Sequence, residues 1–298
     1  MGFNQAPTKE QIISSAQLAE SLRYDSLSVN DHIVFNTSWL DALSCLSVVA
    51  ASTARIRIGT SVLNIVVRNP VVSAKALAAI DILSSGRLFA GVGPGSYYKD
   101  YEACGIPFEE RWPRFSEALE VLVSLLHDDK PVSYRGRYYS FKDITLSPGP
   151  VQKPHLPVHV GSWGSEAGLK RAAKYGDGWM ASAYNITPAK FKEKWDYILS
   201  YRKSIGKDVD SFENSIMTMF GYIDEDREKV HRVAKDVLAP ALRRPAEDLE
   251  RMLLFGSADT CLQKTRELAD AGVKRIHFWP VQEYESQIRL FKEMAAAL

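Results

Sequence analysis

The chain has 298 residues, of which 46% are hydrophobic and 24% are charged, as in an ordinary folded globular protein, so a disordered or fibrous chain is excluded. The 37 Lys and Arg residues balance 36 Asp and Glu residues, and the resulting net charge of +1 provides no basic field for nucleic acid. No apolar run approaches the roughly 20 residues of a membrane span, so we expect no membrane partner.

Three cysteines, Cys45, Cys104 and Cys261, are odd in number and far apart in the chain. This pattern predicts buried thiols in a reducing compartment, with neither a disulfide framework nor a CxxC metal site. The first residues, MGFNQAPTKEQ, lack the basic and apolar regions of a signal peptide. We therefore expect a cytoplasmic enzyme without a metal centre.

Strand patterns and helix patterns alternate along the chain. Thr8 and Gln11 have the spacing of a capping box, and apolar residues recur at helical spacing from Ile12 to Leu22. The predicted strands are Ser26–Asn30, Arg57–Val62, Leu88–Val92, Val158–Gly161, Gly178–Ala181, Ile216–Tyr222 and Arg275–Trp279. The later helices are predicted at Trp39–Ala54, Pro70–Leu83, Phe115–Leu126, Glu166–Tyr175, Pro188–Ile205, helical material to about Leu254, Ala258–Ala271, and a last helix to Leu298.

Seven strand–helix repeats in strict alternation predict an α/β fold with a parallel sheet, and their number favours a single-domain (β/α)8 TIM barrel. Gly2–Asn4 is the candidate for a short first strand. The surplus length lies after the fourth strand and before the fifth, in Ser96–Glu110 and His127–Pro157. Within the second insertion, Val132–Tyr134 and Tyr138–Phe141 predict a short hairpin.

The loops that follow barrel strands carry the chemistry. Asn30-Asp31-His32 follows the second strand, and its imidazole and carboxylate can bind a ligand or exchange protons with it. A turn residue beside an incidental His is an equal alternative. After the third strand, the small and β-branched residues from Gly59 to Asn64 let a flat group approach, although a buried strand end is the favoured interpretation.

Glycines and serines follow the next two strands. Gly91-Val92-Gly93-Pro94-Gly95 permits close backbone approach, departs from a dinucleotide fingerprint, and could equally be a plain turn. After the fifth strand, Gly164 and Ser165 stand where a helix begins at Glu166. Backbone N–H groups and the helix dipole there favour an anion, and we prefer a phosphate site over a helix cap alone.

Taken together, several segments resemble the bacterial-luciferase-like superfamily of barrels. These segments are Asp31-His32, GTSVLNIVVRNP, LSSGRLFAGVGPG, PVHVGSWGSEAGLKRAAKYGDGW and Gly256–Trp279. The resemblance covers essentially the whole chain. Within this superfamily, the chain is similar to the branch that uses the deazaflavin coenzyme F420. It implies an oxidoreductase that transfers a hydride between F420 and a small organic substrate, with FMN as the alternative cofactor.

The resemblance also implies site residues. It places a cis peptide bond at Ser61-Val62, against which the ring of the cofactor rests, and sets His32 and Asp31 on the reactive side as the catalytic pair. The residues expected to bind the cofactor are Ser61, Val62, Asn64, Gly93, Gly95, Ser162, Trp163, Gly164 and Ser165.

Two departures from the family pattern matter. Sugar-phosphate dehydrogenases of this branch have an acidic Glu after the glycine loop, where this sequence has Ser96, which counts against glucose 6-phosphate as the substrate. The first strand is reduced to Gly2–Asn4, which leaves open a late start or a stunted strand. Arg68 and Lys99 are candidates for binding the oligoglutamate tail of F420, although solvated surface roles are equally expected.

The sequence is also compatible with other functions. An FMN-dependent monooxygenase and a non-catalytic flavin-binding protein share the fold, and a barrel for an unrelated sugar phosphate would need only the Gly164-Ser165 site. We expect substrate specificity to lie in the insertions Ser96–Glu110 and His127–Pro157. We further expect a homodimer that acts on a small molecule.

Overall fold

The computed structural model describes residues 6–127 and 130–298, so the candidate strand Gly2–Asn4 lies outside the described residues. The strands are β1 (Ser26–Val29), β2 (Arg57–Thr60), β3 (Leu63–Asn64), β4 (Leu88–Gly93), β5 (Val132–Arg135), β6 (Ser140–Ile144), β7 (Val158–Gly161), β8 (Gly178–Ser182), β9 (Glu213–Ile223), β10 (Leu254–Gly256) and β11 (Ile276–Pro280). The helices are α1 (Lys9–Ser21), α2 (Ala42–Ser52), α3 (Pro70–Leu83), α4 (Tyr98–Ala103), η1 (Phe108–Glu110), α5 (Arg111–His127), α6 (Glu166–Tyr175), η2 (Ala183–Asn185), α7 (Pro188–Ser204), α8 (Arg227–Val233), η3 (Ala234–Leu238), α9 (Ala239–Leu242), α10 (Ala246–Met252), α11 (Ala258–Asp270) and α12 (Tyr284–Ala295).

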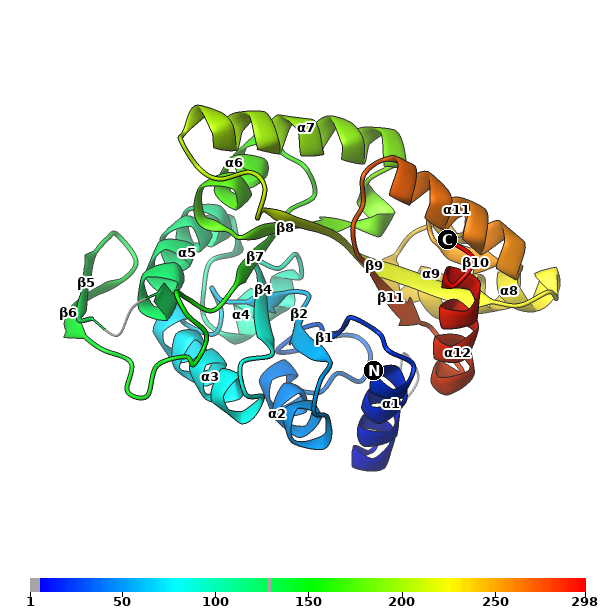
Figure 1. Cartoon of the computed structure of the whole chain (residues 1–298), viewed down its shortest axis with the longest axis horizontal. Coiled ribbons are helices and arrows are strands. Elements are labelled where there is room, and N and C mark those ends of the chain that lie inside the picture. Colours follow the sequence, from blue (N-terminus) through cyan, green and yellow to red (C-terminus); the bar gives the residue numbers. More distant parts are fainter. Residues whose placement is uncertain (1–5, 128–129) are drawn as a thin grey trace.

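Seven parallel strands form a nearly closed barrel in the order β1-β2-β4-β7-β8-β9-β11, which confirms the predicted TIM-barrel class (Figure 1). Two short strands extend the sheet, β3 beside β4 and β10 beside β9. Among the described residues, β1 pairs only with β2 and β11 only with β9. Within these residues, the barrel is therefore open along a seam between β1 and β11.

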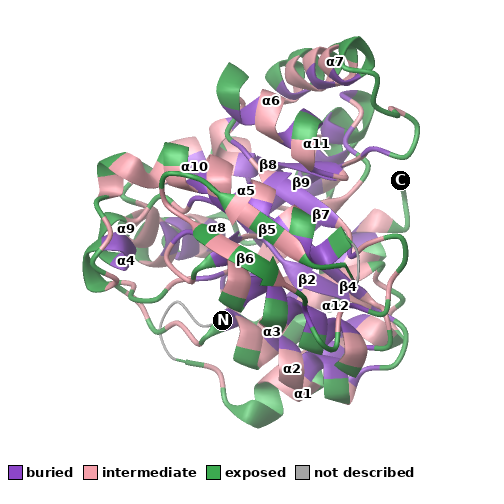
Figure 2. Ribbon diagram, turned by 90° about the vertical axis from the view of Figure 1, so that its left-hand side faces the viewer, coloured by how far each residue is buried: buried purple, intermediate pink, exposed green. Residues whose placement is uncertain are grey.

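Helices surround the sheet, and burial increases from their outer faces to the strands (Figure 2). Local signals start several helices where the sequence predicts them. Thr8 Oγ1 accepts from the Gln11 amide at 3.3 Å while Gln11 Oε1 accepts from the Thr8 amide at 2.9 Å, which confirms the capping box. Among the described residues, no helix is both long and apolar enough to cross a membrane.

The interior of the barrel is filled by side chains. Phe89, Met180 and Met217 form a buried apolar cluster, and Val62 packs against it from the C-terminal end of the strands. Gly59 makes room for this cluster, because a Cβ atom there would lie 2.4 Å from the ring of Phe89. The cluster thus forms an apolar floor beneath the end of the barrel where the chemistry is expected.

Several predicted boundaries are wrong. The predicted helix from Trp39 begins at Ala42, because Asp41 Oδ1 caps it by accepting from the Ser44 amide at 2.8 Å. The helical material predicted to about Leu254 ends at Met252, and the strand β10, which begins at Leu254 and pairs with Gly221, was not predicted. Packing against β9 therefore overrides the local helical pattern.

The remaining corrections fall in two other segments. The second hairpin strand is Ser140–Ile144 rather than Tyr138–Phe141. The predicted strand Arg57–Val62 stops at Thr60, before the peptide bond of Ser61-Val62. Insertion Ser96–Glu110 is not a bare loop, since it contains α4 and η1.

Candidate active site

The predicted site residues converge at the C-terminal end of the parallel strands. Asp31 and Asn64 meet directly, because Asp31 Oδ2 accepts from the Asn64 amide at 3.1 Å. Asn64 pairs in register with Gly93 of β4. The groups that follow β1, β2 and β4 therefore form one continuous wall, as the parallel arrangement requires.

The segment from Ser61 to Asn64 is the centre of this wall. The peptide bond between Ser61 and Val62 is cis, which confirms the prediction. Val62 fits between two strand ends that lack side chains: a Cβ atom at Gly93 would lie 2.7 Å from Val62 Cγ2, and one at Gly161 would lie 2.9 Å from Val62 Cγ1. The glycines thus let the chain carry Val62 across the mouth of the barrel.

Asn64 and Gly95 form a close contact on the same wall. Gly95 has a φ of +69°, and a Cβ atom there would lie 2.4 Å from Asn64 Nδ2. Asn64 Oδ1 accepts from the amides of Val66 and Val67, at 3.2 and 3.4 Å. Asn64 Nδ2 is buried and has no partner within hydrogen-bond distance among the described residues, although the Asn64 side chain partly offsets the rise that burial causes in the pKa of Tyr101. A buried donor of this kind is rarely left unused, so it fits a ligand that brings an acceptor.

The carboxylate of Asp31 forms its hydrogen bonds with other residues of the protein rather than facing the open end of the barrel. Its side chain is fully buried, and its oxygens accept from Arg68 Nη2 at 2.6 Å and Arg68 Nε at 2.8 Å. Burial disfavours the charge of Arg68, but the hydrogen bond and charge of Asp31 outweigh burial and raise the pKa of the guanidinium above its ordinary value. Arg68 also binds Asp41 at 2.6 Å, so its charge is already paired, whereas Lys99 is exposed.

His32 is oriented by a residue that the sequence analysis missed. Its Nδ1 lies 2.8 Å from Oδ2 of Asp100, a carboxylate that is 2% exposed and belongs to α4 in the first insertion. Asp100 Oδ1 accepts from the amides of Ile33 and Val34, each at 2.9 Å, so the carboxylate is itself held in place. Because Nδ1 is occupied, Nε2 is the nitrogen left for a substrate.

Aromatic rings enclose the imidazole of His32. Phe35 stacks on it with ring centroids 4.1 Å apart. Trp39 and Tyr97 meet it edge-on at 5.1 and 5.9 Å. The ring is thus fixed by packing as well as by Asp100, while its side chain keeps 15% of its surface exposed.

The segment after β7 joins the site through Gly161 and begins α6. Ser165 Oγ accepts from the Gly168 amide at 3.3 Å, so Ser165 is the N-cap of the helix. Gly164 has a φ of +95°, and its amide, expected to be free, donates to Ser162 Oγ at 3.2 Å. The first-turn amides of α6 remain as donors for an anion. Trp163 is 54% exposed beside them.

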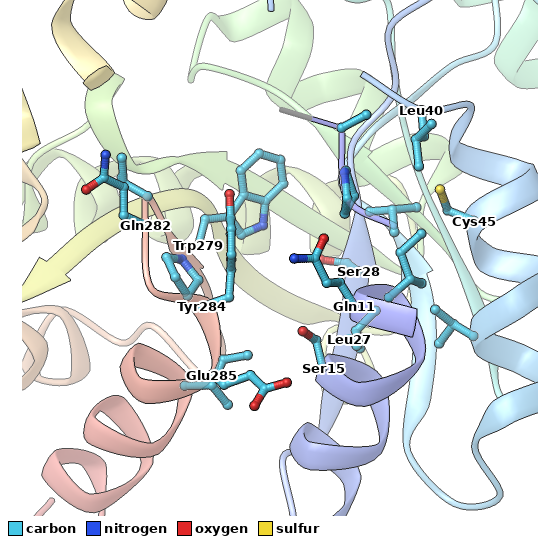
Figure 3. A pocket seen from close by; sticks show the side chains of 18 of the residues that line it. Gln11, Ser15, Leu27, Ser28, Leu40, Cys45, Trp279, Gln282, Tyr284 and Glu285 are labelled. Atoms are coloured by element: carbon cyan, nitrogen blue, oxygen red, sulfur yellow. The ribbon is translucent and has the colours of Figure 1, made fainter. Parts of the chain in front are cut away.

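A large cavity of about 940 Å³ lies in the open seam of the barrel, between α1, β1, β11 and α12. None of the predicted site residues lines it. Figure 3 shows Ser28 of β1 and Trp279 of β11 on different sides of this cavity. Trp39, which also lines it, connects the cavity to the aromatic enclosure of His32. Among the described residues, no group of His, Cys, Asp and Glu side chains could hold a metal ion.

The site can be compared with known proteins. The model of the family described as "Luciferase-like monooxygenase" matches residues 2–275. An F420-dependent glucose-6-phosphate dehydrogenase from Segniliparus rotundus is 32% identical to this chain, and the alignment covers 90% of this chain and 87% of that protein.

Two solved structures share the fold. The structure of an F420-dependent secondary alcohol dehydrogenase in complex with an F420-acetone adduct has a TM-score of 0.87 at 21% identity, covering 98% of this chain and 95% of that one. The structure of a monooxygenase from Streptomyces bottropensis has a TM-score of 0.86 at 22% identity, covering 97% and 94%.

Proposed function

The chain belongs to the luciferase-like monooxygenase family of enzymes, and from this premise we propose that it is an oxidoreductase that exchanges a hydride between the deazaflavin F420 and a small organic substrate. The main support for an enzymatic role is the position of His32. Its Nδ1 is held by Asp100, beside the wall formed by Asp31, Asn64 and Gly93. F420 is favoured over FMN because the relative at 32% identity is an F420-dependent dehydrogenase.

The residues at the site fit a flat cofactor with a phosphate-bearing side chain. The ring would rest against the segment Ser61–Asn64, where Gly93 and Gly161 keep the space around Val62 free of side chains. Asn64 Nδ2, buried without a partner among the described residues, would donate to the ring. The first turn of α6 would hold the phosphate. The cofactor supplies the hydride chemistry when it is bound.

In this proposal the protein handles the proton. Oxidation of an alcohol releases the proton of its hydroxyl group, and reduction of a carbonyl requires one at the oxygen. Nε2 of His32 accepts or returns this proton, while Asp100 keeps the imidazole in one orientation. Asp31 instead stabilises the wall of the site, since its oxygens accept hydrogen bonds from Arg68 and from the Asn64 amide.

The choice of cofactor is tested by titrating the purified protein with F420 and with FMN. We expect tighter binding of F420 and, with reduced FMN supplied, no oxygen consumption beyond background. Micromolar FMN affinity together with substrate-dependent oxygen uptake would instead identify a monooxygenase, an alternative favoured by the structural match at a TM-score of 0.86.

The His32→Ala variant separates an enzyme from a protein that only holds the cofactor. General acid–base groups contribute roughly 10²–10⁴-fold to turnover. We expect a loss of that size in kcat and little change in the cofactor dissociation constant. His231→Ala is the control, because that imidazole bonds to Glu250 on another part of the surface. Equal losses of affinity and turnover in His32→Ala would contradict the proposal.

A further inference from the structure

Three polar side chains, from β1, from β11 and from the residue after β2, are hydrogen-bonded in a row. Ser61 Oγ donates to Ser28 Oγ at 2.9 Å, and Ser28 Oγ lies 2.9 Å from Nδ1 of His277. Burial is the main reason that the pKa of His277 falls to about 3, so its imidazole is neutral. A neutral imidazole carries one N–H, so the hydrogen bond with the Ser28 hydroxyl can form with either tautomer of His277.

His277 occupies a special place on its strand. Ile276 pairs with Ile216 and Phe278 pairs with Met219, so two residues of β9 lie opposite His277. One of them, Thr218, has a φ of +56°. This is the pattern of a β-bulge, which redirects side chains and is common near active sites.

The row of hydrogen bonds crosses the seam at which the barrel is open. Backbone hydrogen bonds do not join β1 to β11 within the described residues, and the seam cavity lies alongside, with Ser28 on its wall (Figure 3). The side-chain link from His277 to Ser28 therefore joins β11 to β1 across this seam.

We infer that Ser28 and His277 are positioning residues, which hold the Ser61 hydroxyl and thereby keep the segment Ser61–Asn64 in the arrangement that receives the cofactor. The row ends at Ser61, and Asn64 three residues later carries the unpartnered Nδ2 donor. Neither Ser28 nor His277 is proposed to touch the cofactor or the substrate. This inference rests on the proposed function, since it assigns the cofactor to that segment.

The test compares Ser28→Ala with a matched control, Ser215→Ala. Ser215 is 1% exposed on the neighbouring strand β9, and its Oγ has no hydrogen-bond partner among the described residues. The measurements are the dissociation constants of F420 and FMN, the melting temperature, and amide hydrogen exchange of residues 61–67 in the cofactor-free protein. We expect Ser28→Ala to weaken cofactor binding about tenfold, the effect of one well-placed hydrogen bond, and to speed exchange in that segment. Ser215→Ala should change neither.

Variants of His277 provide a second, independent test of the positioning role. Asn can place its amide oxygen near the position of the imidazole Nδ1, so His277→Asn should retain most of the cofactor affinity that His277→Ala loses. This rescue would not be expected if His277 only filled space, because Asn and Ala both leave a void there. The His277→Asn arm also decides the question if Ser28→Ala fails to fold.

The outcomes separate the two proposals. If the wild-type protein binds neither F420 nor FMN, the proposed function is wrong, and hydrogen exchange of residues 61–67 alone decides the positioning role. If the wild type binds cofactor and Ser28→Ala matches Ser215→Ala in affinity and exchange, the positioning role is wrong while the proposed function stands. A lowered melting temperature with unchanged affinity would likewise overturn it.

Discussion

Asp100 Oδ2 lies 2.8 Å from His32 Nδ1, although the two residues are 68 positions apart and belong to different strand–loop units. Asp100 comes from an insertion, whereas His32 follows a barrel strand. The insertion thus supplies the group that orients the imidazole.

The first prediction follows from this pair. Asp100→Asn should lower kcat by roughly 10–100-fold, less than the loss expected for His32→Ala, because the imidazole remains but is no longer fixed by a carboxylate. Affinity for the cofactor should change little. Steady-state kinetics and cofactor titration check both statements, with Glu102→Gln on the same helix as the control. An Asp100→Asn variant with wild-type turnover would show that the pair has no role in the reaction.

The second prediction concerns the loop before α6. Gly164→Val should weaken cofactor binding at least tenfold, because Gly164 has a φ of +95° and its amide is bonded to Ser162 Oγ, so a branched side chain must distort the phosphate loop. Gly206→Val is the matched control: its φ is +71°, but nothing lies within 4 Å of the added Cβ atom. Isothermal titration should show a loss of affinity in the first variant alone; similar affinities in both would remove Gly164 from the site.

The third prediction is a dependence of stability on pH. Burial, followed by the charges of Arg275 and His159, lowers the pKa of His277 from 6.5 to about 3 in the folded protein. Below pH 6.5 the unfolded chain binds a proton that the folded chain does not, so stability is lost as the pH falls from 6.5 towards 3. The loss from this group is about 1.4 kcal/mol per pH unit, or about 2 kcal/mol between pH 6.5 and 5.

Urea unfolding of the wild type and of His277→Asn at pH 7 and pH 5 measures this effect. The variant lacks the titrating imidazole, so its stability should fall less between the two pH values. His159, whose pKa burial lowers to about 4, remains in both proteins and contributes equally. Identical pH dependence of the two proteins would mean that folding does not lower the pKa of His277.

The fourth prediction concerns self-association, and we propose that α3 takes part in the expected homodimer. Val72 and Leu83, which are 63% and 60% exposed, lie on one face of α3 because their separation of eleven residues is about three helical turns. Exposed apolar side chains aligned in this way favour contact with a second apolar surface. Leu83→Lys should therefore shift the protein towards the monomer in size-exclusion chromatography with light scattering. Ala189→Lys, at an exposed position of α7, is the control for the added charge alone, and an unchanged mass of the Leu83→Lys protein would exclude α3 from the contact.

Much of the fold could be predicted from local patterns. Alternating apolar periods mark the seven described barrel strands, and caps such as Thr8 and Ser165 start the helices where the sequence places them. The site could also be placed in outline, because the C-terminal ends of parallel strands meet at one end of a barrel. The cis bond at Ser61-Val62 was predicted from the family resemblance and is confirmed.

The partners of the site residues were beyond the reach of the sequence. Nothing in the local pattern around Asp100 distinguishes it from other acidic residues of the insertion, and nothing around Arg68 shows that Asp31 and Asp41 neutralise it. The strand at Leu254 was likewise missed, because its pairing with Gly221 outweighs a helical local pattern.

The sequence by itself thus determined where the seven barrel strands and most of the helices around them lie, since capping and apolar periodicity act between residues a few positions apart. The tertiary structure decided which side chains meet at the mouth of the barrel and across its seam. Asp100 reaches His32, and His277 reaches Ser28, only because the curvature and order of the strands bring distant segments together. Such contacts depend on the closure of the whole sheet, which no short stretch of sequence encodes.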